Sequence, residues 1–345
     1  MSPSGIRAQL ADPYALAVNL PYAVALSAVV AETAWRAVRA GRGAGVVLRP
    51  ARTAALMGLG ALGVGVAYTA LLRMAWSAAS AFELPGARGF WAAHPVAAAG
   101  AAFVAWDLSG FIYHWIGHHT GFGWAAHQPH HSGAGYDMTL GLRQSWTPFH
   151  GLLSHPLLAV AGFDLRTVIV CAAVSSCWQV LQHTSLPVRL PRAIEAVIMT
   201  PASHRHHHGT GSGAVNLGPV LTLWDRLAGT WVPADRPAPA RYGPSDEAAR
   251  GAVVVELAGW KELVTGRLSR NADDDADHLG HARHHEHGDG APWPGRPSGG
   301  GGTSSIAGGP AASWPMPTSG RAIWSSTSER EREPSLGSSS SPAPE

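Results

Sequence analysis

Histidine is the residue type in this sequence that is best suited to chemistry. The chain contains 19 histidines, and most of them stand in groups with a repeated spacing. His114 and His118 are four residues apart, which places both imidazoles on one face of a helix. Two later groups share the pattern H-x2-H-H, and one histidine stands alone after an apolar segment. The candidate metal ligands are His114, His118, His127, His130, His131, His183, His204, His207 and His208.

This number of imidazoles indicates two metal ions, because nine donors exceed what one ion can use. Imidazole binds zinc, copper, iron and nickel, so the ligand type alone does not choose the metal. Abundant imidazole in a membrane protein favours a non-haem di-iron centre that activates O2. Soluble di-iron bundles use paired glutamates instead, and the sequence has no such pairs. Because the ligands must be neutral, metal loading is expected to weaken as the pH falls through about 6.5.

The alternative for any single histidine is a solvated or hydrogen-bonded side chain that binds no metal. Repetition of one spacing beyond apolar segments argues against this alternative for the groups above. A further group with the same pattern, His281, His284 and His285, stands among aspartates, glycines and serines. No apolar segment is there to orient it, so we expect a soluble or opportunistically metal-binding tail.

The elements that must position these groups are predicted to be membrane helices. Hydrophobic residues make up 46% of the chain and charged residues 14%, against about a quarter charged in ordinary soluble domains. Apolar runs at residues 15–35, 54–82 and 95–113 are long enough to span a bilayer. A fourth run, 152–181, is broken at residues 162–166 into halves that are each short for a span. It predicts a helical hairpin that returns to the side from which it came.

Charge predicts the orientation of these helices. Arginines 36, 39, 42, 49 and 52 lie between the first two apolar runs, and Glu32 is the only acid near them. Such a loop faces the cytosol, and it lies on the same side as every histidine group. The predicted fold is therefore an all-α integral membrane protein, whose transmembrane helices and helical hairpin carry a cytosolic, histidine-rich di-metal site. The expected location is a bacterial inner membrane, with the C-terminus in the cytoplasm.

Composition divides the chain into four predicted parts. They are N-terminal transmembrane helices at residues 1–94, a catalytic domain at 95–235, an amphipathic helix within 236–269 and a disordered tail at 270–345. The net charge is only +2, so a nucleic-acid partner is excluded. The two cysteines, Cys171 and Cys177, lie in an apolar stretch and are expected to pack rather than to form a disulfide.

The order of these motifs resembles the fatty acid hydroxylase and sterol desaturase superfamily of membrane di-iron oxygenases. The similarity runs from about Trp106 to Trp231. It is carried by Asp107 with its spacing to His114 and His118, and by residues 124–132, 142–145, 182–184, 200–201, 204–209 and 224–230. The Leu-Arg-Gln-Ser and His-Thr elements are most similar to the branch that holds alkylglycerol monooxygenase and its bacterial relatives. The resemblance implies a helical membrane core, two iron ions and O2-dependent C–H chemistry on a lipid.

Two carboxylates are candidates to support the metal ligands. Asp107 lies seven residues before His114, two helical turns away on the same face. Carboxylates inside a membrane are usually functional, so Asp107 is expected to accept a hydrogen bond from a ligand imidazole or to tether its helix. Asp225 is expected to lock the last loop beneath the metal site, by pairing with Arg226.

The expected function is an O2-dependent membrane oxidoreductase that hydroxylates or desaturates a sterol, a fatty acyl lipid or an alkyl lipid. Arg143 and Gln144 are candidates to hydrogen-bond the metal ligands or the lipid head group; loop capping is the alternative. The sequence has no flavin, haem or ferredoxin motif, so a separate redox partner or reductant is expected to supply electrons. Two other functions stay open at this point, a metal-binding or metal-transport membrane protein and a non-catalytic scaffold.

Overall fold

The computed structural model describes residues 12–147, 149–243 and 251–266 of the 345-residue chain. These residues belong to the first of two compact units, residues 1–287; the second unit, 288–345, lies outside the described residues, as does the predicted tail. The helical elements in chain order are α2 (Pro13–Ala40), η1 (Gly41–Gly43), α3 (Gly45–Ser80), α4 (Ala87–Ala93), α5 (Pro95–His119), α6 (Gly121–His131), η2 (Met138–Leu142), α7 (Phe149–Val160), α8 (Leu165–Leu181), α9 (Arg192–Glu195), α10 (Pro201–His207), α11 (Leu223–Ala228) and α12 (Ala252–Val264).

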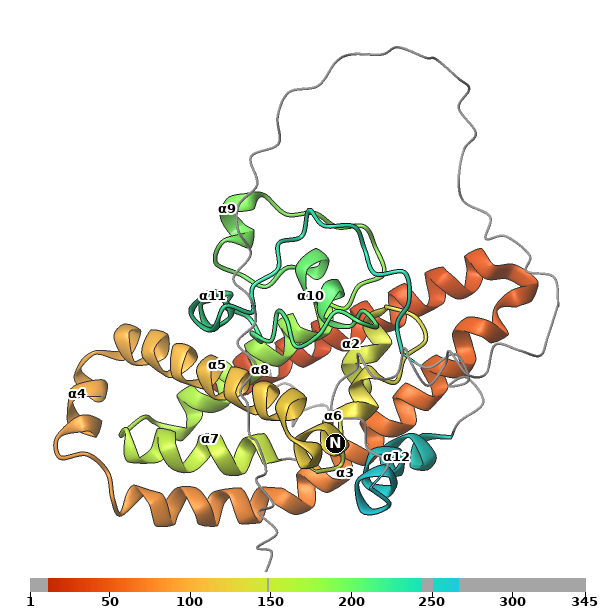
Figure 1. Cartoon of the computed structure of the whole chain (residues 1–345). Coiled ribbons are helices and arrows are strands. Elements are labelled where there is room, and N and C mark those ends of the chain that lie inside the picture. Colours follow the sequence, from red (N-terminus) through yellow and green to blue (C-terminus); the bar gives the residue numbers. More distant parts are fainter. Residues whose placement is uncertain (1–11, 148, 244–250, 267–345) are drawn as a thin grey trace, which may run out of the picture. The chain divides into compact units, whose positions relative to one another are not determined.

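The predicted all-α fold is confirmed (Figure 1). Apart from helices, the described residues contain only isolated β-bridges, Ile198 with Leu221 and Gly209 with Tyr242. Three helical segments are long and apolar enough to cross a membrane: Pro13–Gly43, Gly45–Ser80 and Pro95–His119. Large apolar side chains on them stay exposed; Val66 is 69% exposed and Leu62 is 64% exposed. Lipid must therefore cover these faces, and the chain is an integral membrane protein.

The connection between the first two spans is shorter than the sequence predicted. α3 begins at Gly45, so η1 and Ala44 alone separate it from α2. Gly41 makes the turn with a positive φ of 53°, which an L side chain rarely adopts. The arginines expected in an extended loop lie mostly on the ends of the two helices, where their long side chains reach the polar region of a bilayer.

The predicted hairpin is formed by α7 and α8. Asp164 caps α8, because its carboxylate accepts a hydrogen bond from the Thr167 backbone N–H at 3.1 Å. Gly162 makes the turn at φ 78°, and a Cβ there would lie 2.7 Å from the Cβ of Ala87. Both the backbone conformation and the close approach of α4 therefore require glycine.

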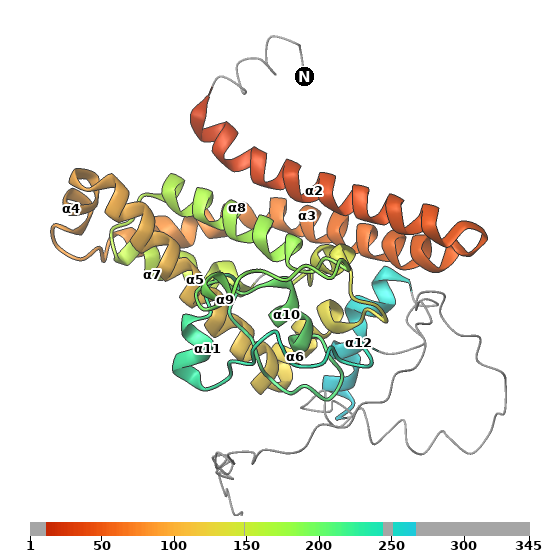
Figure 2. The same cartoon turned by 90° about the horizontal axis from the view of Figure 1, so that it is seen from above.

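The helices pack in layers that hold the hairpin in the middle. α7 lies between α3 and α5, and α8 packs against α2 and α5 (Figures 1 and 2). The hydrophobic core where α5 meets the hairpin consists of Ala102, Trp106, Leu158, Phe163, Val168 and Cys171. The short helices α9 to α11 and their connecting segments follow the hairpin, and α12 packs on α6 and α3. The histidines lie where these later segments meet the ends of α5 and α8.

Candidate metal centre

A tight turn joins α5 and α6, the two helices that carry five of the candidate histidines. The Thr120 hydroxyl accepts a hydrogen bond from the Gly123 backbone N–H at 2.9 Å and so begins α6. A Cβ at Gly123 would lie only 2.1 Å from the Ile116 carbonyl oxygen, so this approach requires glycine. The turn brings together histidines from two adjoining helices: His114 and His118 of α5, and His127, His130 and His131 of α6.

The remaining candidates lie on α10 and directly after α8. Thr200 caps α10 by accepting from the Ser203 backbone N–H at 3.2 Å, and a proline occupies the first turn. Within seven residues α10 then presents two of the candidate ligands, and its C-terminal cap is a third candidate. These are His204, His207 and His208, and His183 joins them from the end of α8.

The structure brings all nine predicted histidines together, in two clusters. The five-histidine cluster consists of His114, His118, His127, His131 and His207, and the four-histidine cluster consists of His130, His183, His204 and His208. In each cluster the candidate ligand nitrogens all lie within 4.8 Å of one another. Both H-x2-H-H groups contribute to both clusters, so the two clusters adjoin.

The nitrogen positions in the four-histidine cluster would suit the ligands of one metal ion. Nε2 of His183 lies 3.2 Å from Nε2 of His130, 3.0 Å from that of His208 and 3.1 Å from that of His204. Nδ1 of His183 donates to the Gln179 carbonyl at 2.5 Å, so its Nε2 carries a lone pair and no proton. One lone pair cannot serve three neighbours, whereas a cation about 2 Å from each nitrogen would.

In the five-histidine cluster, backbone carbonyls likewise fix which imidazole nitrogen carries the proton. Nδ1 of His114 donates to the Leu217 carbonyl at 2.7 Å, and Nδ1 of His207 donates to the Val215 carbonyl at 2.9 Å. These bonds leave both Nε2 atoms as acceptors aimed into the cluster. Nε2 of His114 and of His118 is buried and has no hydrogen-bond partner within the described part of the chain. A metal ion would satisfy these orphaned nitrogens, so the residues present fit one.

Burial keeps these imidazoles in the neutral form that binds metal. It lowers the pKa of His183 to about 4. Burial, with smaller contributions from neighbouring histidines, lowers the pKa of His127, His131, His204, His207 and His208 well below the usual range. The pH below which metal loading weakens should therefore lie under the value of about 6.5 expected for free imidazole.

Both predicted carboxylates are fully buried, and both bind one loop rather than a histidine. Asp225 accepts hydrogen bonds from the Leu217 and Gly218 backbone N–H groups at 2.7 Å each. Asp107 accepts from the backbone N–H groups of the next residues in that loop, at 2.9 and 3.1 Å, and from Trp224 Nε1 at 2.9 Å. The loop in turn offers the Leu217 carbonyl to a ligand imidazole, so the carboxylates reach the cluster through its backbone.

The expected pairing of Asp225 with Arg226 is not observed in the described structure. Arg226 donates through Nε to the Ala196 carbonyl at 3.2 Å instead. Asp225 takes its third hydrogen bond from the Thr230 hydroxyl at 2.6 Å.

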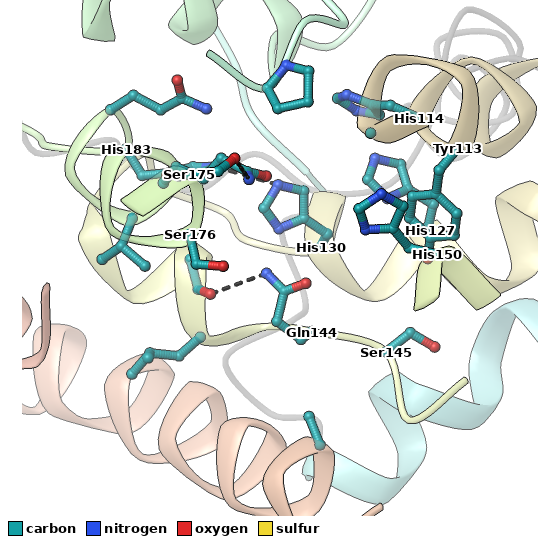
Figure 3. A pocket seen from close by; sticks show the side chains of 18 of the residues that line it. Tyr113, His114, His127, His130, Gln144, Ser145, His150, Ser175, Ser176 and His183 are labelled. Carbon is teal, nitrogen blue, oxygen red and sulfur yellow. Dashed lines mark hydrogen bonds between the residues drawn. The ribbon is translucent and has the colours of Figure 1, made fainter. Parts of the chain in front are cut away.

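The two other predicted polar residues take different positions. Arg143 is buried, and its guanidinium donates to the Ser132 hydroxyl at 2.9 Å and to the Pro50 carbonyl at 3.4 Å. It therefore ties the start of α3 to the end of α6. Gln144 donates to the Gly141 carbonyl at 3.0 Å, which caps the turn η2, and its side chain lines a cavity (Figure 3).

Two buried glutamates were missed by the sequence reasoning. Glu32 of α2 accepts from the Met138 N–H at 2.8 Å and from the Ser185 N–H and hydroxyl at 2.6 Å each. Glu256 of α12 accepts from the Trp146 N–H at 2.9 Å. Both partners lie more than 100 residues away in the chain, so no local spacing could reveal them. A lone acid in an otherwise apolar or helical segment was the one available signal.

A cavity of about 500 Å³ connects the spanning helices with both clusters. Tyr22 and Ala25 of α2 and Gly58 and Ala61 of α3 line one part of it. Five cluster histidines line another part: His114, His127, His130, His183 and His204. Figure 3 shows His114, His127 and His130 around the same space, with His183 beyond. An apolar chain in the cavity would reach both clusters.

Not every histidine in a matching motif joins a cluster. His206 is 7% exposed and belongs to neither cluster, although it stands between ligand candidates on α10. His281, His284 and His285 lie outside the described residues.

Comparison with known proteins confirms the resemblance. Residues 99–230 match the family model described as fatty acid hydroxylase. Alkylglycerol monooxygenase of Danio rerio is 32% identical over 135 residues, which cover 38% of this chain and 30% of that protein. Ornithine lipid hydroxylase OlsE of Rhizobium tropici is 29% identical over 115 residues, which cover 31% of this chain and 34% of that protein. The chain thus spans about a third of the length of these curated relatives, and no solved structure matches it.

Proposed function

We propose, from the match of residues 99–230 to the fatty acid hydroxylase family model, that this chain is a membrane oxygenase that hydroxylates a lipid with O2 at a di-iron centre. The names of the relatives, a monooxygenase and a lipid hydroxylase, favour hydroxylation over desaturation. The observation that carries the proposal is the pair of adjoining histidine clusters on one cavity between spanning helices.

In this proposal the nine histidines hold two iron ions, one in each cluster. Bound iron supplies the electron transfer to O2 that oxidation of a C–H bond requires. Gln179, Val215 and Leu217 keep three of the ligand imidazoles in the required tautomer through their carbonyls. Asp107 and Asp225 act as positioning residues, since they hold the loop that carries the last of these carbonyls. Electrons come from a separate redox partner or reductant.

The spanning helices deliver the lipid and exclude water. The cavity begins among residues of α2 and α3, so the acyl or alkyl chain enters from between the spans. In the proposed division of the chain, residues 1–94 supply this wall and residues 95–235 supply the metal ligands. Residues 236–269 close the site with α12, and residues 270–345 form a tail that the site does not need.

The proposed orientation places the metal centre and the C-terminus on the cytoplasmic face of a bacterial inner membrane. The arginine-rich helix ends lie on the histidine side, because Arg36 forms an ion pair with Asp137 and Arg143 binds the Pro50 carbonyl. A cysteine introduced at residue 42 should be labelled by a membrane-impermeant maleimide only after the cells are opened. Labelling in intact cells would contradict this orientation.

Lipid profiling under labelled oxygen tests the proposed activity. Cells with and without the gene are grown under 18O2, and a His130→Ala variant serves as the inactive control. We expect one lipid class to gain a single 18O atom only with the wild-type gene. A lipid that loses two hydrogens and gains no label would indicate desaturation. Metal accumulation with no change in any lipid would favour the metal-transport alternative.

A further inference from the structure

Outside the two clusters, the wall of the cavity carries polar side chains among its apolar ones, and none of the polar ones among the described residues is an acid, a lysine or an arginine. The polar side chains outside the two clusters include those of Tyr113, Gln144 and His150. A neutral hydrogen-bonding group would find hydrogen-bond partners among these side chains.

His150 is the histidine in this wall that belongs to neither cluster. It lies in the first turn of α7, and Figure 3 shows it beside Tyr113 on the cavity. Its ring packs against Trp106 at a centroid distance of 4.6 Å and against Tyr113 at 5.4 Å. These contacts fix the ring plane without using either nitrogen.

A neighbouring serine fixes the tautomer of His150. The Ser109 hydroxyl donates its proton to the Trp106 carbonyl at 2.6 Å, so it can only accept from other groups. His150 Nε2 lies 3.0 Å from this oxygen and must therefore be the donor. Nδ1 is then an unprotonated acceptor, and it has no hydrogen-bond donor among the described residues. Because His150 lines the cavity, a donor group on a bound ligand would satisfy this nitrogen.

We propose that Nδ1 of His150 accepts a hydrogen bond from a hydroxyl group of the lipid that enters this cavity. This step rests on the proposed function in that it names the substrate class of the same site, a lipid with a neutral hydroxyl. His150 thereby selects a hydrogen-bond donor over a group that can only accept, such as an ether or a carboxylate. The bond also fixes how far the chain extends toward the two clusters.

Binding of matched probes to the purified full-length protein tests this role without turnover. Radiolabelled hexadecan-1-ol is bound in detergent and displaced by 1-methoxyhexadecane or by hexadecanoate. We expect the preference for the alcohol over the methyl ether to fall about tenfold in His150→Phe, since one buried hydrogen bond is lost. His155→Phe is the matched control, because His155 lies on the same helix and does not line the cavity. Its preference should equal that of the wild type.

Two further measurements keep the result interpretable. Ser109→Ala removes the group that holds the proton on Nε2, so it should also reduce the preference for the alcohol, even where His150→Phe does not fold. Metal content should be unchanged in all three variants. A wild-type preference in His150→Phe, or in Ser109→Ala where His150→Phe does not fold, overturns the proposal. Absence of iron from the wild type would instead contradict the proposed oxygenase and leave the binding ratios to decide the role of His150.

Discussion

Backbone carbonyls set the chemistry of the cluster histidines one residue at a time. Each carbonyl takes the proton of an Nδ1 and leaves the Nε2 lone pair directed into a cluster. The pairs are Gln179 with His183, Leu140 with His130, Val215 with His207 and Leu217 with His114. Because these bonds do not depend on a bound ion, they would preorganise the proposed ligands for metal.

Replacing one ligand should remove the metal of its own cluster. His207 Nε2 lies 3.1 Å from His131 Nε2 within the five-histidine cluster. We expect His207→Ala to lower the iron content by about half, since the four-histidine cluster keeps all its donors. His206→Ala is the matched control, one residue away on the same helix and in neither cluster, and it should keep the wild-type iron content. Elemental analysis of both purified variants makes the comparison, and equal iron loss in the two would contradict the assignment.

The lowered pKa values predict how stability changes with pH. His183 titrates near pH 4 in the folded protein and near 6.5 in the unfolded chain. Between these values the unfolded chain binds more protons, so the free energy of unfolding falls as the pH is lowered. Each such histidine contributes up to about 1.4 kcal/mol per pH unit.

The loss of stability at low pH should be clearest in the metal-free protein. Its thermal midpoint should be highest above pH 6.5 and should fall steadily between about pH 6.5 and 4. Bound metal should shift the decrease in the thermal midpoint to lower pH, because the ion competes with protons for the same nitrogens. A midpoint that stays constant or rises toward pH 4.5 would show that the histidines are not buried in the neutral form.

At the scale of elements, α2 does more than anchor the chain in the membrane. Its Glu32 binds backbone and hydroxyl groups of residues directly after His183 and at the start of η2. A buried carboxylate at the end of a spanning helix thus sets where α8 delivers His183. α12 acts similarly on the other side, where Glu256 holds the backbone of Trp146.

Glu32→Gln should therefore loosen the four-histidine cluster. An amide keeps one acceptor oxygen but turns an NH2 group toward backbone donors, at a cost of about 2 kcal/mol. We expect a lower thermal midpoint and a partial loss of iron. Asn19→Ala is the control on the same helix, since within the described structure the Asn19 side chain bonds only to the Ala15 carbonyl of its own helix. Unchanged stability and iron content in Glu32→Gln would show that α2 does not position the cluster.

At the scale of the molecule, the described residues contain the whole proposed site. Both clusters, the cavity and α12 lie within residues 12–266. A chain truncated after Arg270 should insert into the membrane and keep its iron. A chain truncated after residue 249 also loses α12 and Glu256, and it should lose stability. Loss of half the iron in the chain truncated after Arg270 would implicate the histidines of the tail in metal binding.

The sequence was informative where a property is local. Histidine spacing on α5, α6 and α10 depends on a few neighbouring residues, so eight of the nine members of the clusters were found from spacing. His183 has no spacing partner, and it was expected from the hairpin and the family resemblance. Apolar length likewise revealed three spans and the α7–α8 hairpin. Helix ends were less accurate: α3 begins at Gly45, because arginines at a membrane surface do not interrupt a helix.

Features that depend on distant contacts were not predictable. His150 has no spacing partner, and its role depends on Ser109, 41 residues away. The division of the ligands into five and four follows from how α6 and α10 face each other, which no single motif encodes. Asp107 and Asp225 were identified as supporting residues, but their common loop and its carbonyls became visible only in three dimensions.

Anomalous diffraction at the iron edge from crystals of the full-length protein tests the central claim most directly. Two anomalous peaks are expected, one in each cluster, each about 2 Å from the Nε2 atoms that surround it. One of the peaks should lie among His130, His183, His204 and His208. No iron signal in either cluster, or a single peak placed away from both, would contradict the di-iron assignment.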